Sequence, residues 1–419
     1  MTDALTCRRA LEALRNGVPN ADAVKILGCI QPEAERRFGE LLSGAGDAGG
    51  PPAGAAGMLV SGDFGAGKSH LLTYLEQQAL ARGFVCSKVA ISKETPLYDL
   101  GKVFKAAVDN GRIPDRNGRL IEELGQALDP NSGDYEDFRL WADDPRSSRL
   151  SRMFPASLLV HERSNDLALN GEIENFWAGD RILISKIKSG LRQIGQLQHY
   201  KFRAPRAAEL PPQRLRFLVE LIKAAGYRGW VVLLDEIELV GSYSLLQRGR
   251  SYAELARWLG RAAGEPYPGL VAVGTVTDDF AATIISPDGD KKDRDYVKVR
   301  LERGDRYRSI ADLAVTGMNL LERGDISLVP PHADDVRETV EKLRGIYATA
   351  YGWDAPVLRE QARGAGYQNR MRYKVRASIN EWDLLRLYPD ARPEIEVEEF
   401  RPDYVEDADL EQSSPDDEQ

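Results

Sequence analysis

The sequence lacks the features of a membrane-inserted or exported protein. No stretch approaches the roughly 18 consecutive apolar residues that a membrane-spanning helix needs. The beginning of the chain, MTDALTCRRALEALRNG, is amphipathic and has no apolar core of the kind found in secretory signals. We therefore expect a cytoplasmic protein that makes no contact with a membrane.

Cysteine and histidine are scarce, with 3 and 4 residues in a chain of 419. Cys7, Cys29 and Cys86 lie far apart and form no CxxC pair, so neither a disulfide framework nor a zinc site is indicated. The histidines form no constellation for metal catalysis. We expect the cysteines to be reduced thiols that act as small apolar side chains.

The excess of negative charge lies at the end of the chain. Residues 390–419 carry 6 Asp and 7 Glu against 2 Arg, a balance of −11, whereas the whole chain balances at −9 and the remainder is therefore +2. Such a segment has little to bury and is typical of a solvated tail. The alternative is a docking or autoinhibitory segment that imitates nucleic acid or binds a basic partner.

Changes in composition and periodicity divide the chain into regions. We expect an N-terminal helical segment over residues 1–43, a flexible Gly/Ala/Pro-rich loop over 44–57, a core over 58–306 with a helical insertion at about 111–215, a C-terminal helical lid domain over 307–389, and the acidic tail over 390–419. In the core, apolar strands alternate with helices. This alternation predicts an α/β fold with a doubly wound parallel sheet.

A glycine-rich loop follows the first predicted strand of the core. Gly62 and Gly67-Lys68-Ser69 fit the GxxxxGK[ST] pattern of a phosphate-binding loop, the Walker A motif. The loop backbone and the N-terminus of the next helix would bind phosphates, Lys68 would reach the β- and γ-phosphates, and Ser69 would bind Mg²⁺. The residues expected to line this part of the nucleotide site are Gly62, Asp63, Phe64, Gly65, Ala66, Gly67, Lys68, Ser69 and His70.

A second motif, which is acidic, favours hydrolysis of the bound nucleotide over phosphate binding alone. In VVLLDEIE, Asp235 ends an apolar strand, where it would hold Mg²⁺ as the Walker B aspartate. Glu236 would polarise the water that attacks the γ-phosphate, which argues against a kinase, since a kinase must exclude that water. Glu238 lies further along, and we expect it to be structural or to face a partner.

Three further residue sets are candidates for nucleotide sensing or nucleic-acid contact. A polar residue at the end of the strand GLVAVGTVT would lie beside the γ-phosphate; Thr277 is preferred, with Thr275 as the alternative. In the C-terminal helices, Arg370 or Arg372 would contact the nucleotide, unless they belong to a solvated basic helix face. The basic stretch LQHYKFRAPR, 197–206, contains interleaved aromatics that could bind nucleic acid or form a solvated loop.

Several stretches resemble a known family: ALRNGVPNADAVKILGC, GDFGAGKSHLL, SKETPLYDLGKVF, GYRGWVVLLDEIELV and LLRLYPDARPE. They are similar to the BrxD-type ATP-binding proteins of bacteriophage-exclusion (BREX) defence systems. The resemblance covers roughly residues 10–110 and 220–390. It implies a P-loop AAA+-like (ASCE) ATPase with a C-terminal helical domain, for which a winged-helix-like fold is left open. The segment around Val18, Pro19 and Asn20 would form the adenine pocket. Glu94 would be a polar switch or a turn former.

The function expected from this resemblance is ATP hydrolysis coupled to the remodelling or loading of a partner, a helicase of the same system, on DNA. A homo-oligomer is expected by analogy, since an arginine acting in trans would require a second subunit. ATP and Mg²⁺ would be the cofactors. The alternative is a nucleotide-dependent switch or assembly scaffold that hydrolyses ATP slowly.

Overall fold

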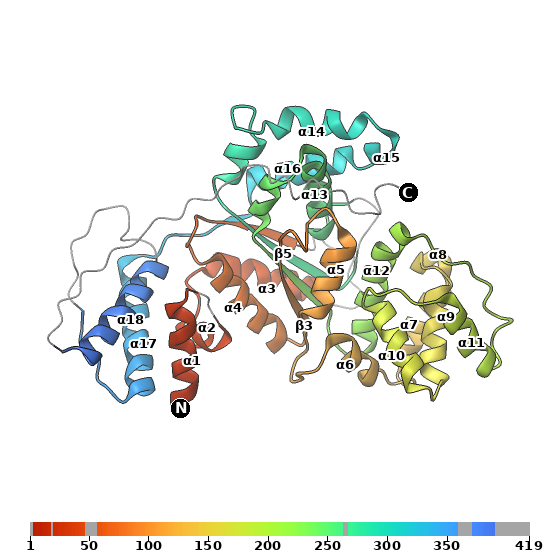
Figure 1. Ribbon diagram of the computed structural model, residues 1–419, viewed down its shortest axis with the longest axis horizontal. Coiled ribbons are helices and arrows are strands. Elements are labelled where there is room, and N and C mark those ends of the chain that lie inside the picture. Colours follow the sequence, from red (N-terminus) through yellow and green to blue (C-terminus); the bar gives the residue numbers. More distant parts are fainter. Residues whose placement is uncertain (1–2, 18–19, 47–56, 263–266, 359–370, 390–419) are drawn as a thin grey trace.

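A mixed sheet of six strands lies at the centre of the computed structural model, which describes residues 3–17, 20–46, 57–262, 267–358 and 371–389 (Figure 1). The strands lie in the order β3-β2-β4-β5-β1-β6. Their bounds are β1 (Gly57–Ser61), β2 (Val85–Ala90), β3 (Gly111–Arg112), β4 (Trp230–Asp235), β5 (Leu270–Val276) and β6 (Ile326–Ser327). Thus β5 separates the strand that precedes the predicted phosphate loop from the strand that ends in Asp235.

The predicted α/β class is confirmed, but the prediction of an all-parallel sheet is wrong at one edge. Five of the described strands run parallel, whereas β3 is antiparallel to its neighbour β2. A single residue, Asn110, separates β3 from helix α5 (Leu100–Asp109). One residue is too short for the reversal that a parallel crossover needs, so the chain pairs with β2 in the opposite direction.

Side chains of the central strands alternate between two buried faces. In β4, Val232 and Leu234 belong to the core on one side of the sheet, and Val231 and Leu233 belong to the core on the other side. Every residue of β4 and β5 is buried. The near-continuous apolar sequence of these strands is therefore explained by helices that cover both faces of the sheet.

Two groups of helices cover the faces. One face packs against α3 (Pro32–Gly46) and α4 (Lys68–Ala81). The other face packs against a larger set that shares the main core: α5, α12 (Leu210–Ala224), α13 (Leu245–Trp258), α14 (Asp293–Glu302), α15 (Asp305–Arg308), α16 (Ala311–Arg323) and the short turns η2 (Ile237–Ser242) and η3 (Ala281–Ile285).

Between β3 and α12 the chain forms a group of helices at one end of the molecule, on the right in Figure 1. Its elements are α6 (Leu120–Ala127), α7 (Gly133–Asp143), α8 (Pro145–Ser148), α9 (Met153–Arg163), α10 (Leu167–Trp177), α11 (Ile184–Gln193) and the short turn η1 (Ala207–Glu209). Phe138, Phe154 and Trp177 surround Phe217 of α12 at ring-centroid distances of 5.2–5.3 Å. This group therefore shares one continuous core with the sheet.

Both ends of the described chain meet in a second helical group, on the left in Figure 1. Its members are α1 (Ala4–Arg15), α2 (Ala21–Leu27), α17 (Ala333–Tyr351) and α18 (Met371–Leu387), which share a separate core cluster. Arg15 forms an ion pair of 2.8 Å with Asp383, and the hydroxyl of Tyr347 donates to the same carboxylate at 2.7 Å. We call these four helices the terminal unit.

Two predicted boundaries differ from this arrangement. The boundary between residues 306 and 307 falls ahead of α16 and β6, and β6 pairs with β1 in the sheet. The C-terminal helices that belong to the terminal unit therefore begin only at α17. Helix α3 extends to Gly46 and β1 begins at Gly57, so most of the predicted loop 44–57 lies outside the described residues, as does the acidic tail 390–419.

A buried ion pair joins α13 to α14. Arg248 and Asp293 are 2% and 0% exposed, and the guanidinium donates to both carboxylate oxygens at 2.7 and 2.8 Å. The hydroxyl of Tyr252 donates to Asp293 at 2.6 Å, and Arg248 also donates to the carbonyl of Tyr243 at 2.6 Å. Such a pair is costly to break, because the surviving charge is left buried without a partner.

Among the described residues, no helix is long and apolar enough to cross a membrane.

We predict that Asp293→Asn lowers the free energy of unfolding by about 3–5 kcal/mol, since Arg248 would keep its charge in a buried site. Chemical denaturation monitored by circular dichroism measures this change. Asp312→Asn, which breaks a surface contact to Lys298, is the matched control and should have little effect. Equal stability of the two variants would contradict the structural role of the buried pair.

Candidate nucleotide site

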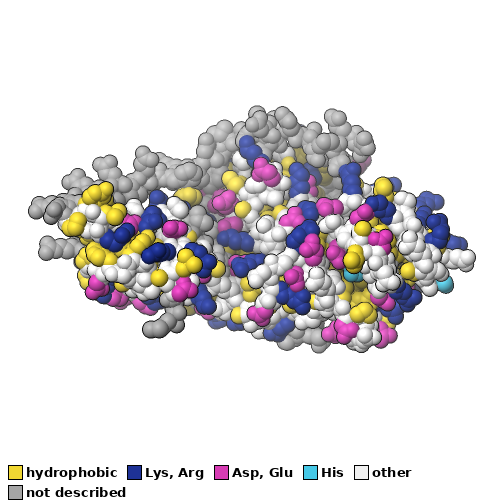
Figure 2. Space-filling view, turned by 60° about the horizontal axis from the view of Figure 1, so that its bottom comes forward, with side chains coloured by type: hydrophobic (Ala, Val, Ile, Leu, Met, Phe, Trp, Pro, Cys, Tyr) yellow, Lys and Arg dark blue, Asp and Glu magenta, His cyan; other side chains and the backbone are white. Residues whose placement is uncertain are grey.

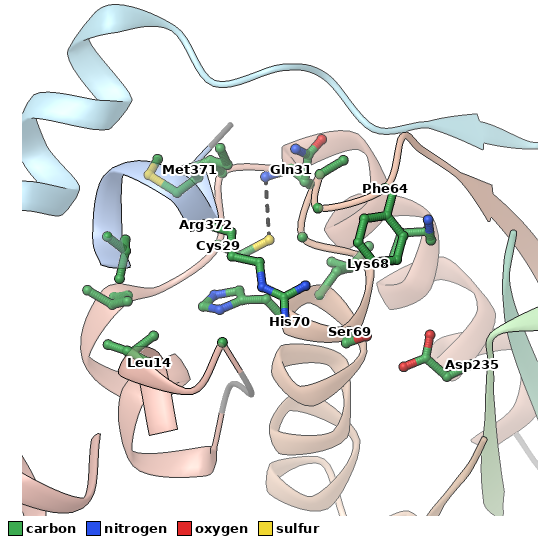
Figure 3. Close-up of a pocket in the computed structure, with 18 of the residues that line it drawn as sticks. Leu14, Cys29, Gln31, Phe64, Lys68, Ser69, His70, Asp235, Met371 and Arg372 are labelled. Carbon is green, nitrogen blue, oxygen red and sulfur yellow. Dashed lines mark hydrogen bonds between the residues drawn. The ribbon is translucent and has the colours of Figure 1, made fainter. Parts of the chain in front are cut away.

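A cavity of about 530 Å³ lies between the carboxyl ends of the strands and the terminal unit (Figure 3). Its walls come from four parts of the chain: the glycine-rich loop with the start of α4, the ends of β2 and β4, the segment from α1 to Gln31, and helices α17 and α18. Segments more than 300 residues apart in sequence thus face each other across this cavity.

The glycine-rich loop has the backbone that the sequence predicted. Gly65 and Gly67 adopt positive φ angles of 83° and 98°, a region that side chains disfavour. Gly67 directly precedes α4, so the free N–H groups at the helix start lie next to the loop. The ammonium of Lys68 donates to the carbonyls of Gly62 at 2.8 Å and Asp63 at 3.4 Å. Phe64, Gly65, Ala66, Gly67, Lys68, Ser69 and His70 line the cavity.

Asp235 reaches the same cavity from the end of β4. The hydroxyl of Thr275, on the neighbouring strand β5, donates to its Oδ1 at 2.7 Å. The ammonium of Lys88, on β2, lies 3.7 Å from its Oδ2 and donates to the carbonyl of Ser69 at 3.4 Å. Thr275 was the alternative to Thr277 in the sequence prediction; Thr277 lies buried just beyond the end of β5.

Glu236 also lines the cavity, and its backbone is strained. Its φ and ψ of 62° and 38° are left-handed, which is uncommon for a residue with a side chain and marks many functional positions. Partial burial, and next the negative charge of Asp235, raise the pKa of Glu236. The side chain remains exposed, so a bound ligand or a water molecule can reach it.

Glu238, which we expect from the sequence to be structural or to face a partner, also lines the cavity. It is 8% exposed, and its Oε1 lies 3.9 Å from the ammonium of Lys68. Its Oε2 is buried without a hydrogen-bond partner among the described residues. Burial raises the pKa of Glu238, and the charge of Lys68 opposes that shift. The spacing in DEIE was the available sequence signal, since it places a third acid within three residues of Asp235.

The far end of the cavity is apolar and comes from the terminal unit. Leu14, Leu27, Met371 and Val375 line it. His70 fixes this end to the phosphate loop, because its Nε2 lies 2.7 Å from the carbonyl oxygen of Gly28. Burial lowers the pKa of His70, so the neutral ring donates this hydrogen bond. Its role is therefore mainly structural.

Gln31 provides the second tether. Its side-chain amide donates to the carbonyl of Val329 at 2.9 Å and accepts from the N–H of the same residue at 3.0 Å. Val329 follows β6, which is paired with β1. The wall formed by the N-terminal segment is thus hydrogen-bonded to the edge of the sheet that carries the phosphate loop.

Arg372 extends from α18 into the cavity, above the start of α4 (Figure 3). Its guanidinium lies against Gly17, where an added Cβ would meet the nearest nitrogen at 2.6 Å. Gly17 has a φ of 72° and follows the end of α1. A glycine is therefore needed here both for the turn and for the position of Arg372.

The remaining sequence predictions have different outcomes. Val18, Pro19 and Arg370 lie outside the described residues. Glu94 is exposed and accepts a hydrogen bond of 2.9 Å from Ser92 within a turn, an arrangement that matches the turn-forming alternative. Lys88 was missed, although a single lysine in the apolar strand FVCSKVAI was a visible signal.

The donors at this site fit Mg²⁺ held mainly by a bound phosphate. The described residues contain no group of three or more His, Cys, Asp or Glu side chains arranged for a metal. Mg²⁺, however, usually takes one or two protein oxygens and completes its shell with phosphates and water. Ser69 and Asp235, which both line the cavity, can supply such oxygens.

One of the comparisons with known proteins identifies a family. The family model described as BREX system ATP-binding protein BrxC/D matches residues 10–119 and 212–368. The first segment contains the glycine-rich loop, and the second contains Asp235, Glu236 and helix α17. The helices α6 to α11 lie between the two matched segments. No curated protein and no solved structure matches the chain.

We predict that Lys68→Ala weakens the binding of ATP about tenfold or more, because it removes a charged donor to the phosphates. Titration of the full chain with a fluorescent ATP analogue measures this affinity. Lys25→Ala, which changes an exposed lysine of α2, is the control and should bind normally. Unchanged affinity in Lys68→Ala would show that the loop is not the phosphate site.

Proposed function

The chain belongs to the family of BREX system ATP-binding proteins BrxC/D, and from this membership we propose that it is a P-loop ATPase that hydrolyses ATP to ADP and phosphate. The observation that carries the proposal is the meeting of Lys68, Asp235 and Glu236 at one cavity. Phosphate binding alone would not require an exposed carboxylate beside the Walker B aspartate.

Each residue has a role that follows from its position. The loop backbone and Lys68 would bind the β- and γ-phosphates. Ser69 and Asp235 would hold Mg²⁺, which neutralises charge on the phosphate oxygens when bound. Glu236 would accept a proton from the attacking water. Thr275 would fix the orientation of Asp235, and the apolar end of the cavity would hold the adenine base.

An AAA+-like (ASCE) core is supported by two features. A parallel strand, β5, lies between β1 and β4, so that the phosphate loop and Asp235 come from strands that are not neighbours. A helix from the C-terminal part places Arg372 in the cavity. A winged-helix-like form of this part stays a proposal from the sequence.

The proposals of a partner helicase, of DNA as its substrate and of a homo-oligomer rest on the resemblance to the family. In this proposal the chain works in the cytoplasm as a homo-oligomer and couples ATP hydrolysis to the remodelling or loading of a helicase on DNA. Light scattering with and without ATP tests the oligomer. A mass that stays at that of one chain in both states would contradict it.

A slow switch is the second candidate function, and one observation favours it. Lys68 donates to carbonyls of its own loop and lies close to Glu238, so binding of the γ-phosphate requires these contacts to change. A multiple-turnover ATPase assay, with and without duplex DNA, separates the candidates. Sustained turnover supports the ATPase, whereas a single turnover followed by tight nucleotide retention supports the switch.

We predict that Glu236→Gln lowers the hydrolysis rate about 100-fold or more while ATP binding is retained, because the amide cannot accept the proton. Single-turnover hydrolysis and nucleotide binding, measured on the same preparation, check both parts. Glu94→Gln, which changes an exposed carboxylate in the turn after β2, is the control. Hydrolysis at the native rate in Glu236→Gln would refute the assignment.

We also predict that Arg372→Ala weakens ATP binding about tenfold but affects ADP much less, since the guanidinium would contact the γ-phosphate. Arg376→Ala, one turn further along α18 and exposed, is the matched control. Competition titrations with ATP and ADP give the two affinities. An equal loss for both nucleotides would mean that Arg372 does not distinguish the γ-phosphate.

A further inference from the structure

A stretch of one charge sign lies in the helical group far from the nucleotide cavity. From Arg181 to Arg206 the chain has seven Lys and Arg and no Asp or Glu, although its overall charge is −9. The stretch contains α11 and the segment that leads to η1. Dark blue side chains gather at this end of the molecule in Figure 2, on the right, where Figure 1 places α11.

Two aromatic rings of this stretch each contact a cation. The guanidinium of Arg152, at the start of α9, lies 4.9 Å from the ring centroid of Tyr200. The ammonium of Lys188, on α11, lies 5.8 Å from that of Phe202. Lys201 and Arg203 flank Phe202 in sequence, and Arg192 is one helical turn from Lys188. We call Arg152, Lys188, Arg192, Lys201 and Arg203 the basic surface.

The acidic side chains beside the basic surface neutralise little of its positive charge. Asp143 pairs with Arg152 at 2.9 Å, and Glu172 pairs with Lys186, on a different side of α11. Arg192, Lys201 and Arg203 are exposed and make no ion pair with a described residue. Three exposed cations whose charge is not neutralised there raise the local concentration of a polyanion.

The two rings distinguish between kinds of nucleic acid. Tyr200 and Phe202 are partly buried against the main core, and each has a cation at its ring. Single-stranded nucleic acid is usually bound by bases that stack on open aromatic rings. Here the exposed groups are the cations of Arg192, Lys201 and Arg203, which are suited to phosphates rather than to stacking with bases. Such contacts suit a duplex, whose bases are paired and whose charge density is high.

We propose that the basic surface binds the phosphate backbone of double-stranded DNA without reading its sequence. The binding site lies apart from the nucleotide cavity, since the helical group and the terminal unit are at opposite ends of the molecule (Figure 1). This DNA form and this surface are the ones that the proposed function would use. The proposal rests on that function only for its biological role. Binding itself requires no hydrolysis.

The test is fluorescence anisotropy of the full chain without nucleotide, using a labelled DNA duplex of about 30 base pairs and its single strand, from about 50 to 200 mM salt. The variant carries Arg192→Glu, Lys201→Glu and Arg203→Glu. We expect wild type to prefer the duplex and the variant to bind it at least about tenfold more weakly. The dependence of log K on log salt should fall by about 0.9 for each lost contact.

The control variant carries Arg300→Glu, Arg303→Glu and Arg323→Glu, which give the same change in net charge on the surface of α14 and α16. There the cations alternate with acids, as in the pairs Lys298–Asp312 and Arg294–Glu322. We expect this variant to keep most of its duplex affinity. Equal losses in the two variants would reduce the effect to net charge and would overturn the proposal.

Two other results would also overturn it: no duplex binding by wild type at low salt, or a preference for the single strand. A milder variant with Gln at the same three positions guards against misfolding and should show a smaller loss in the same direction. Basal ATP hydrolysis and thermal unfolding should match wild type in all variants. Failure of hydrolysis would leave the DNA result intact, because the binding assay contains no nucleotide.

Discussion

The parallel pairing of β5 with β1 on one side and with β4 on the other is the constraint on which the rest of the structure depends. It sets Ser61 beside Val276 and Leu234 beside Gly274. The glycine-rich loop and Asp235 therefore both lie at the carboxyl ends of the strands, and Thr275 lies between them. A shift of one residue in this register would turn each strand's side chains to the opposite face. Close packing on both faces opposes such a shift, because the exchanged side chains would no longer fit the helices that cover them.

The terminal unit completes the site that the sheet begins. Its apolar side chains form the far wall of the cavity, and it contributes Arg372. Its attachments include hydrogen bonds from His70 to Gly28 and from Gln77 to Ala21, and Gln31, just after the unit's second helix, is bonded to Val329. These bonds join the unit to the phosphate loop and to the sheet edge, so a change in the loop reaches the unit through few intermediates.

Much of the candidate site could be predicted from the sequence, because its motifs are local. Lys68 and Ser69 follow an apolar strand within one loop, and Asp235 and Glu236 end another. Their roles depend on the few residues around them and on the general rule that ligands bind at the carboxyl ends of parallel strands. Arg372 was one of two candidates, because basic residues are frequent in that helix and periodicity does not say which one enters a cavity.

The contributions of Lys88 and Glu238 were harder to predict, because they depend on packing between segments distant in sequence. The same holds for Tyr200 and Phe202, whose sequence pattern suggested open stacking platforms but whose rings pack against the core. The antiparallel β3 depends on a connection of one residue, a detail that an alternating pattern of strands and helices does not show.

The terminal unit also has a consequence for the order in which the molecule is made. Helix α1 is synthesised more than 300 residues before α17 and α18, against which its apolar face is buried. Until then α2 is the one helix of the terminal unit on which α1 can pack, whereas most of the sheet and its covering helices are already present. Because a chain folds unit by unit from its N-terminus as it is synthesised, the sheet can form before the cavity has its far wall. In the proposed function, a chain that ends before α18 would hold the phosphate loop and Asp235 but would lack Met371, Arg372 and Val375 of the cavity wall.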